Sequence, residues 1–275
     1  MSLRTPGSSR LSKRDESWCA EPVKLVTIGF SHYCEKARWG LDRVGVEYTE
    51  EAHAPIGHFL AILRAGGKKT VPILLTNDGV FDDSTDILKY LDPFGPAEAH
   101  LYPEHEEERR EVEELETLFD EKLGGEVRRW VYSWIIDDVP LLRSIFEGSM
   151  TKGERALRKI LVPAARAGIK KGMKITPRLR ESRLEKIHEV YDRVEGRLTS
   201  GGYLVGDRFS AADLALAALS VPALLPIENG WPSPALADFP EGMQRQVAEL
   251  RKTKAGAHAL RMYREERSRR FTAKL

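Results

Sequence analysis

The stretch FSHYCEKARW, residues 30–39, follows the short apolar run VKLVTI at residues 23–28. An apolar run of this length is typical of a buried strand. After it, Ser31 has the side chain of a helix N-cap, and apolar residues recur at helical spacing as far as Val44. The sequence therefore predicts a strand that leads directly into a helix, with Ser31 and a lone cysteine, Cys34, near the start of that helix.

The elements that follow this helix alternate between strands and helices. An Asn-Asp-Gly turn at residues 77–79 lies between two apolar runs, which is a strong hairpin signal. The predicted elements are a strand at 46–52, a helix at 56–65, strands at 70–75 and 80–81, and a helix at 82–92. This order predicts an α/β domain in which a parallel portion is closed by an antiparallel hairpin.

The composition limits the class of protein. A chain of 275 residues can hold one large domain or two of ordinary size, and 41% hydrophobic residues can form a sizeable core. A formal net charge of +1 argues against a dedicated nucleic-acid binder. The two cysteines, Cys19 and Cys34, are too few for a disulfide framework and favour a reduced, cytoplasmic protein.

The sequence shows no targeting or membrane segment. No apolar run approaches the roughly 20 residues that a membrane helix needs. Residues 1–21 lack the apolar region of a secretory signal, and their polar, Ser- and Arg-rich composition predicts a disordered leader. The first domain is therefore expected at residues 22–92.

The second half of the chain is predicted to be helical. Proline and glycine cluster at residues 93–96, which predicts a linker at 93–102. Residues 103–275 show no strand alternation, so they are expected to form a helical domain. Within them, Ser210 and Asp213 have the spacing of a capping box, which marks the start of a helix.

Several of these features together resemble the N-terminal domain of cytosolic glutathione transferases. They are the thioredoxin-like element order, the Ser31-x-x-Cys34 turn, Thr70-Val71-Pro72 before a strand, and Asp83-Ser84 at a helix start. The Ser210 capping box resembles one in the family's C-terminal domain. The resemblance implies an α/β thioredoxin-like domain followed by an all-α helical domain, and a homodimer. Residues 130–176 depart from the familiar pattern, which points to an atypical class.

The same resemblance implies that glutathione is the co-substrate and indicates which residues bind it. Pro72 corresponds to a cis proline, and Val71 lends its backbone to the cysteinyl part of glutathione. Asp83 and Ser84 hold the γ-glutamyl group. Lys69, just before the Thr-Val-Pro turn, is a further candidate ligand for a glutathione carboxylate, with a solvated lysine as the alternative. The Asp-Ser pair has a physical rationale as well, because a helix N-terminus suits a carboxylate and an adjacent acid suits an ammonium. Plain helix capping is the alternative for this pair.

The expected chemistry depends on Ser31 and Cys34. Ser31 aligns with the family position that stabilises the glutathione thiolate, and a serine there implies conjugation to a small hydrophobic electrophile, as in detoxification. Cys34 stands in the place of the second cysteine of a redox pair. One alternative is therefore a glutathione-dependent thiol/disulfide reductase that uses Cys34, although an inert, buried Cys34 also fits. Another is a non-catalytic binding protein of the same fold.

Three further residues are candidates for the acceptor-substrate pocket, which the family forms between its domains. His32 follows Ser31, and Trp130 and Trp134 lie in an aromatic-rich segment, where an ordinary place in the core is the alternative. The histidine pairs are spaced more widely than typical zinc ligands, and no cysteines cluster with them. We therefore expect no metal, no nucleic-acid partner and no membrane span.

Overall fold

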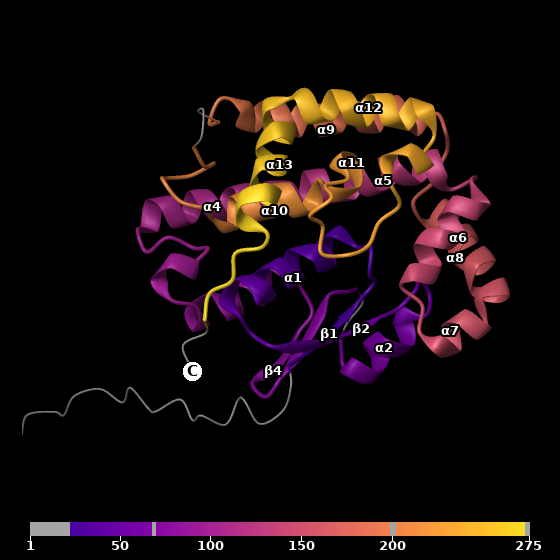
Figure 1. Ribbon diagram of the computed structural model, residues 1–275, viewed down its shortest axis with the longest axis horizontal. Coiled ribbons are helices and arrows are strands. Elements are labelled where there is room, and N and C mark those ends of the chain that lie inside the picture. The colour runs from indigo at the N-terminus through magenta and orange to yellow at the C-terminus, as the bar shows by residue number, and fades with distance from the viewer. Residues whose placement is uncertain (1–22, 68–69, 199–201, 273–275) are drawn as a thin grey trace, which may run out of the picture.

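The computed structural model describes residues 23–67, 70–198 and 202–272 (Figure 1). The expected leader at residues 1–21 and the candidate glutathione ligand Lys69 lie outside the described residues. An α/β domain is followed by a helical domain, and helix α1 (His32–Val44) lies between the sheet and the helical domain. None of the helices in the described ranges is long and apolar enough to cross a membrane.

The α/β domain is built on a four-stranded sheet. Its strands are β1 (Val23–Thr27), β2 (Tyr48–Ala52), β3 (Ile73–Thr76) and β4 (Gly79–Phe81), in the order β2-β1-β3-β4. β1 and β2 are parallel, whereas β3 is antiparallel to both β1 and β4. The predicted hairpin is confirmed, because Thr76 pairs with Gly79 across a two-residue turn. The domain therefore has the thioredoxin-like arrangement.

Helices cover both faces of this sheet. α1 and α3 (Ser84–Leu91) pack on one face, where Leu25 of β1 belongs to the same buried cluster as Leu41 and Ile87. α2 (His58–Ala65) packs on the other face, where Val26 lies in a cluster with Ile62. Neighbouring strand residues point to opposite faces, so Leu25 and Val26 hold the two layers together. The turn after β1, which carries Ser31, is thus anchored from both sides of the sheet.

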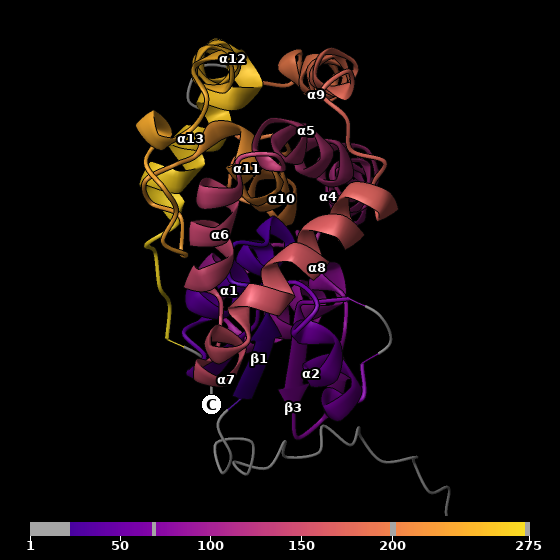
Figure 2. The ribbon, with the colours of Figure 1, turned by 90° about the vertical axis from the view of Figure 1, so that its right-hand side faces the viewer.

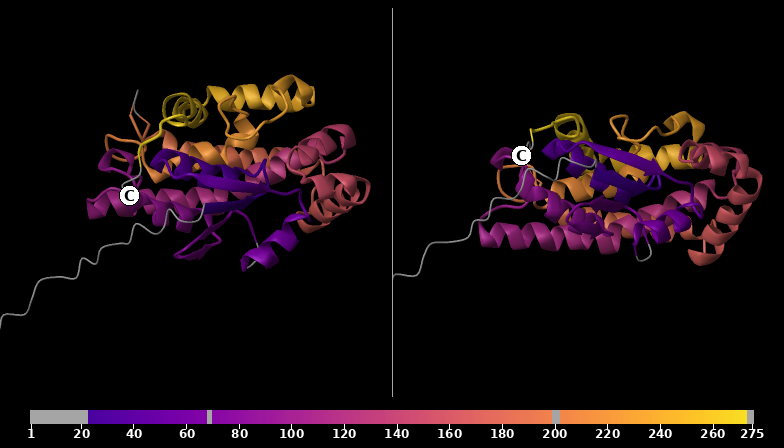
Figure 3. Two further views of the ribbon diagram at one scale, coloured as in Figure 1. Left: turned by 60° about the horizontal axis from the view of Figure 1, so that its bottom comes forward. Right: turned by 90° about the horizontal axis from the view of Figure 1, so that it is seen from below.

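The helical domain surrounds one wholly buried helix, α10 (Ala211–Leu219). Helices α6, α7 and α8 form a group at one end of the molecule (Figure 3), and α8 slants from the helical domain down towards α2 (Figure 2). The remaining α-helices of the described residues are α4 (Glu106–Leu118), α5 (Gly125–Ile135), α6 (Val139–Gly148), α7 (Lys152–Ala156), α8 (Arg158–Gly172), α9 (Leu179–Glu195), α11 (Val221–Leu224), α12 (Glu241–Lys252) and α13 (Lys254–Glu266). Short 3₁₀ turns occur at Asp92–Phe94, Ala97–Ala99 and Leu236–Asp238.

Several helices differ from the boundaries that the sequence pattern indicates. α4 and α5 form one continuous run, joined by the π-helix Phe119–Gly124 (η4). In contrast, α12 and α13 are separate helices, divided at Thr253. Thr253 has an extended backbone, and its side chain accepts a hydrogen bond as the N-cap of α13. Hydrophobic spacing alone cannot detect either feature, since both helices carry their apolar stripe across the irregularity.

The predicted capping box at the start of α10 is confirmed. Asp213 accepts hydrogen bonds through Oδ2 from the backbone N–H of Ser210 at 3.1 Å and from its hydroxyl at 3.0 Å. Its other oxygen, Oδ1, accepts from the backbone N–H of Leu204 at 3.0 Å and contacts Nε2 of His258 at 2.7 Å. Asp213 is fully buried, so it ties the start of α10 to the preceding loop and to α13.

A second buried polar cluster joins the two domains. Lys36 of α1 is fully buried, and its Nζ lies 2.7 Å from Asp120, 2.9 Å from Glu116 and 2.7 Å from the hydroxyl of Thr85. Burial by itself lowers the pKa of Lys36, but the two carboxylates outweigh it, so the pKa lies above its ordinary value. A buried cation that is paired in this way holds α1 and α3 against α4 and η4.

Candidate active site

Two cavities adjoin each other between the domains. The smaller has a volume of about 280 Å³ and the larger about 900 Å³. Of the described residues, those that line both cavities are Ile28, Ser31, His58 and Arg128. The Ser31 side chain therefore stands where the two spaces meet.

The smaller cavity gathers most of the glutathione ligands that the sequence suggests. Ser31, Val71, Pro72, Asp83 and Ser84 all line it. They come from three separate segments: the start of α1, the turn before β3 and the start of α3. The Val71–Pro72 peptide bond is cis. The arrangement brings a backbone turn, a helix N-terminus and a carboxylate to one small polar space.

The start of α3 combines capping with a place in the cavity wall. Asp83 is the N-cap, and its Oδ1 accepts from the backbone N–H groups of Thr85 at 2.8 Å and Asp86 at 3.4 Å. Ser84, the first helical residue, is buried, whereas Asp83 is exposed. Capping, the alternative interpretation of Asp83, is thus observed, and the same side chain also faces the cavity.

Ser31 is the N-cap of α1, yet its side chain makes no capping hydrogen bond within the described chain. Its backbone is held at both ends: its N–H donates to the carbonyl of Ile28 at 2.9 Å, and its carbonyl accepts from Glu35 at 2.9 Å. The hydroxyl therefore does not cap the backbone of the helix, and its partner within the described chain is the thiol of Cys34. The positive end of the α1 dipole points to the junction of the cavities, a place that favours an anion.

Cys34 lies one turn into α1, and it is not among the residues lining either cavity. Its side chain is fully buried. Burial raises the pKa of the thiol to about 11, although the charge of Arg38 and a hydrogen bond with Ser31 act in the opposite direction. A thiol with this pKa stays protonated at neutral pH, so it is a poor nucleophile.

The larger cavity has mainly apolar walls. Ile28, Phe30, Pro55, Ile56 and Phe59 come from the α/β domain. The helical domain supplies the rest of the apolar lining, including Val131, Ile135, Ile145, Ile169, Met173 and Leu225. A concave apolar space with a few polar groups at one end is typical of a site for a hydrophobic small molecule.

His32 lines the larger cavity as a neutral side chain. Its ring is buried, and Nε2 lies 3.0 Å from the carbonyl of Gly124, to which it donates in the neutral form. Burial, together with the charge of Arg128, lowers the pKa of His32 to about 3. The histidine is therefore uncharged at neutral pH and cannot act there as a general acid.

Trp130 and Trp134, the other two candidates for the acceptor pocket, do not line either cavity. Trp130 is fully buried, and its Nε1 donates to Gln246 at 3.0 Å. Trp134 lies against Gly242 and under the guanidinium of Arg180, whose Cζ is 4.0 Å from the ring centroid. Both tryptophans lie on the face of α5 that packs on other helices. They therefore have an ordinary place in the core, which was the alternative to a place in the acceptor pocket.

The opposite face of α5 supplies residues that the sequence interpretation missed. Arg128, Val131, Tyr132 and Ile135 line the larger cavity. These residues follow one another at intervals of three, one and three positions, which places them on one face of a helix. The sequence alone therefore shows that they share a face. The sequence alone does not show which way this face points, because the direction depends on the π-helix that precedes α5.

Tyr33 and His58 were also missed. Tyr33 lines the smaller cavity, and its hydroxyl donates to the carbonyl of Asp120 at 2.9 Å. Burial and the nearby Asp120 raise the pKa of Tyr33 to about 12. His58 lines both cavities, and its Nδ1 accepts from the backbone N–H of Ile56 at 3.1 Å. Burial lowers the pKa of His58 below its ordinary value.

Among the residues that the structure describes, no group of three or more histidine, cysteine, aspartate or glutamate side chains could hold a metal ion.

Comparisons with known sequences identify the two domains. Residues 25–94 match the family model of the glutathione S-transferase N-terminal domain, and residues 167–240 match that of the glutathione S-transferase C-terminal domain. Together the matches span a little more than half of the chain. No curated protein matches the sequence.

Solved structures share the fold at low sequence identity. Glutathione transferase GSTFuA3 from Phanerochaete chrysosporium is 16% identical, with a TM-score of 0.58 over 89% of this chain and 96% of that one. A possible glutathione S-transferase from Rhodopseudomonas palustris is 17% identical, with a TM-score of 0.55 over 90% and 95%. A Methylobacterium radiotolerans glutathione S-transferase, solved with glutathione sulfonate, is 18% identical, with a TM-score of 0.50 over 87% and 95%. With both domains matched and the fold shared, the chain belongs to the glutathione S-transferase family.

Proposed function

We propose that this protein is a glutathione transferase that conjugates the glutathione thiolate to a small hydrophobic electrophile, with Ser31 stabilising the thiolate. The observation that carries the proposal is the position of Ser31, which lines both the polar and the apolar cavity. A sulfur atom beside Ser31 can therefore belong to a molecule in the smaller cavity and react with a molecule in the larger one.

Glutathione fits the donor set of the smaller cavity. The N-terminus of α3, with Ser84 at its first position, suits the α-carboxylate of the γ-glutamyl group. Oδ1 of Asp83 makes both capping bonds, so Oδ2 can accept from the ammonium while the cap stays in place. Val71 precedes β3 in the cavity wall, where its backbone can pair with the cysteinyl residue. Lys69 remains a proposed ligand for a carboxylate.

The chemical step is a nucleophilic attack by sulfur on carbon. The thiol of glutathione first loses its proton to solvent, and the thiolate then forms a carbon–sulfur bond. The electron pair of the breaking bond at the electrophilic carbon leaves with the leaving group, or moves along the acceptor in an addition. A hydrogen bond from the Ser31 hydroxyl and the positive end of α1 both favour the thiolate over the thiol, whose ordinary pKa is about 8.5.

The other proposed properties follow from the family. We propose a homodimer from the family alone; a cytoplasmic location agrees with the free thiol of Cys34, and a role in detoxification agrees with the apolar acceptor cavity. No particular feature of the site favours either alternative function, the non-catalytic binding protein or the thiol/disulfide reductase. A reductase that uses Cys34 needs a reactive thiol within reach of glutathione, and Cys34 is buried and outside the cavity lining.

The test compares the wild-type protein with Ser31→Ala and Cys34→Ala. Glutathione binding is measured by titration calorimetry, and conjugation is measured with a chlorodinitrobenzene acceptor. We expect wild type and Cys34→Ala to bind and conjugate, and Ser31→Ala to bind with little conjugation. No glutathione binding by wild type would support the non-catalytic alternative. Disulfide reduction that survives Ser31→Ala and is lost in Cys34→Ala would support the reductase.

A further inference from the structure

One wall of the larger cavity is an extended segment between α11 and α12. This segment, Pro226–Pro234, is called the strap below. Its residues Pro232, Ser233 and Pro234 line the larger cavity, and no strap residue lines the smaller one. The strap has no regular secondary structure, so its position depends on what it touches.

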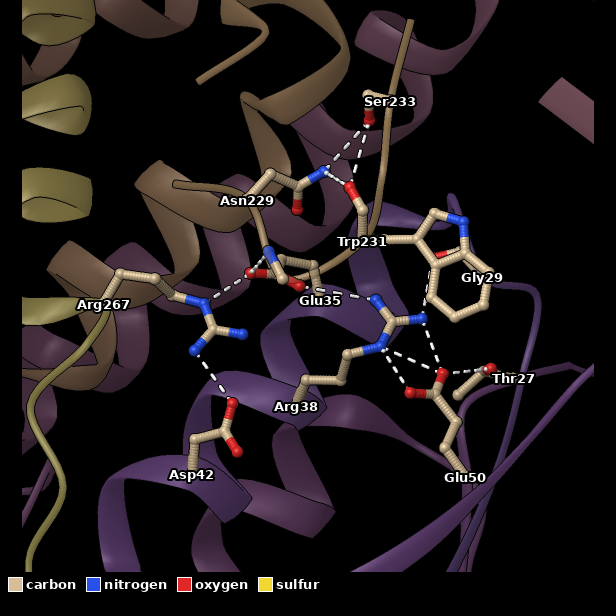
Figure 4. Close-up of polar contacts among 11 residues, drawn as sticks. Thr27, Gly29, Glu35, Arg38, Asp42, Glu50, Asn229, Trp231, Ser233 and Arg267 are labelled. Atoms are coloured by element: carbon tan, nitrogen blue, oxygen red, sulfur yellow. Dashed lines mark hydrogen bonds and ion pairs between the residues drawn. The ribbon is translucent and has the colours of Figure 1, made fainter. Parts of the chain in front are cut away.

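A buried carboxylate on α1 holds the strap. Oε1 of Glu35 accepts from the backbone N–H of Gly230 at 3.1 Å and from Nε of Arg267 at 2.7 Å (Figure 4). Glu35 is 1% exposed, which makes these hydrogen bonds costly to lose. Arg267, which follows α13, also pairs with Asp42 of α1 at 2.9 Å. The strap, α1 and the segment after α13 therefore meet at one carboxylate.

Arg38 extends the same cluster to the turn that carries Ser31. Its Nη2 donates to the carbonyl of Gly29 at 2.7 Å, and its guanidinium pairs with Glu50 at 2.8 Å. The Cζ atom of Arg38 lies 5.1 Å from the ring centroid of Trp231 in the strap. Figure 4 shows Trp231 beside Gly29 and Arg38, so the strap and the Ser31 turn rest on one another.

Two glycines make this close approach possible. A Cβ atom at Gly29 would overlap the ring of Trp231. A Cβ atom at Gly230 would overlap the guanidinium of Arg267 and crowd the carboxylate of Glu35. The strap is thus seated through contacts that leave no room for a methyl group, and its position is well determined.

We propose that Glu35 and Arg267 are positioning residues for acceptor specificity: they seat the strap and thereby shape the wall of the acceptor cavity. The proposal rests on the proposed function, since it assigns the larger cavity to the hydrophobic acceptor. Neither side chain lines either cavity, so both act through the strap. Since no strap residue lines the smaller cavity, loosening the strap acts directly on the larger cavity only.

The experiment uses Arg267→Met and Gly230→Ala, which disturb the same contact from its two sides. We expect both to raise KM for a chlorodinitrobenzene acceptor by about tenfold, as loss of a hydrophobic pocket wall does. KM for glutathione should stay within twofold of wild type. The matched control is Arg270→Met, which also removes a partner of Asp42 but from an exposed side chain that does not reach the strap. Arg267→Lys should recover part of the loss.

A binding measurement separates this proposal from the proposed function. Anilinonaphthalene sulfonate, a fluorescent apolar probe, is titrated into each variant without glutathione, and circular dichroism checks that each is folded. We expect about tenfold weaker probe binding in Arg267→Met and Gly230→Ala, even if wild type shows no conjugation. If Arg267→Met does not fold, Gly230→Ala decides the result. Folded variants whose probe affinity and acceptor KM match wild type, or whose two KM values rise together, would overturn the proposal.

Discussion

The two cavities are built in different ways. The smaller cavity is lined almost wholly by the α/β domain, and Arg128 is its one contribution from the helical domain among the described residues. The larger cavity takes most of its lining from the helical domain, from α5, α6, α8, the strap and the segment after it. The polar half of the site is thus made by local structure close to the sheet, and the apolar half by the packing of distant helices. Substitutions can test each half separately.

The largest effect is expected at Ser31, because it belongs to both cavities. Ser31→Ala should lower kcat/KM by about 100-fold, as loss of a preorganised hydrogen-bond donor does, and should move the pH–rate profile to higher pH. Glutathione affinity should change little. Steady-state kinetics across pH provide the measurement. Ser182→Ala, at a serine of α9 that lines neither cavity, is the control and should behave as wild type. Full activity in Ser31→Ala would contradict the mechanism.

The second-largest effect is a pH dependence of the free energy of unfolding, and it is expected from His32 in the wall of the larger cavity. The folded protein keeps His32 neutral down to a pKa of about 3, because of burial first and Arg128 second, whereas the unfolded chain binds the proton near pH 6.5. The unfolded state therefore binds more protons between these values. The free energy of unfolding should fall by about 1.4 kcal/mol for each pH unit below about 6.5, and this loss continues down to the folded pKa.

Urea unfolding at a series of pH values between 7 and 4.5 measures this effect. His32→Gln should remove about 2 kcal/mol of the acid-induced loss by pH 5. His105→Gln, at an exposed histidine that starts α4, should show the wild-type slope. Equal slopes in wild type and His32→Gln would mean that the ring is accessible to protons in the folded state.

A smaller effect should separate the two cavities. Asp83→Asn keeps a good N-cap for α3 but removes the charge that the proposed mode of binding pairs with the glutathione ammonium. KM for glutathione should rise by about tenfold, consistent with the loss of one charged hydrogen bond, while KM for the acceptor stays unchanged. Asp86→Asn, on the exposed side of the same helix turn, serves as the control. An equal rise in both KM values would show that the cavities are not independent.

The smallest effect is expected at Cys34, which lines neither cavity. Cys34→Ala should keep conjugation activity within twofold of wild type, because the buried thiol has a pKa of about 11 and is protonated. The test is the conjugation assay, together with the thermal midpoint to account for lost packing. An activity loss well beyond the loss of folded protein would show that sulfur at this position takes part in the chemistry.

The contrast between the cavities also explains what the sequence could predict. The strands, the hairpin, the α10 capping box and three residues of the smaller cavity, Ser31, Pro72 and Asp83, depend on short-range signals: an N-cap, a turn, a proline before a strand. These signals act between residues that are close in the chain, so they can be recognised without the structure. The resemblance then linked Ser31, Val71 and Asp83, which local signals alone do not connect.

The larger cavity could not be predicted in this way. Trp130 and Trp134 were chosen because they are aromatic, yet the face of α5 that meets the cavity carries Arg128 and Ile135 instead. Which face turns inward is decided by the packing of α5 and by the π-helix before it. The position of the strap is even less predictable from the sequence, because Glu35, Gly230 and Arg267 are far apart in the chain and meet only when it is folded.

The π-helix Phe119–Gly124 also links the length of this helical run to the face that α5 turns towards the larger cavity. Each residue of an α-helix advances the chain by about 100° around the axis. If a related protein lacked one residue in this turn, α5 would keep its sequence but rotate by that angle. Arg129, Tyr132, Ser133 and Ile136 would then face the cavity in place of Arg128, Val131, Tyr132 and Ile135. A single deletion outside the pocket would thus change two of these four side-chain types, Val to Tyr and Tyr to Ser, without a substitution in the pocket wall.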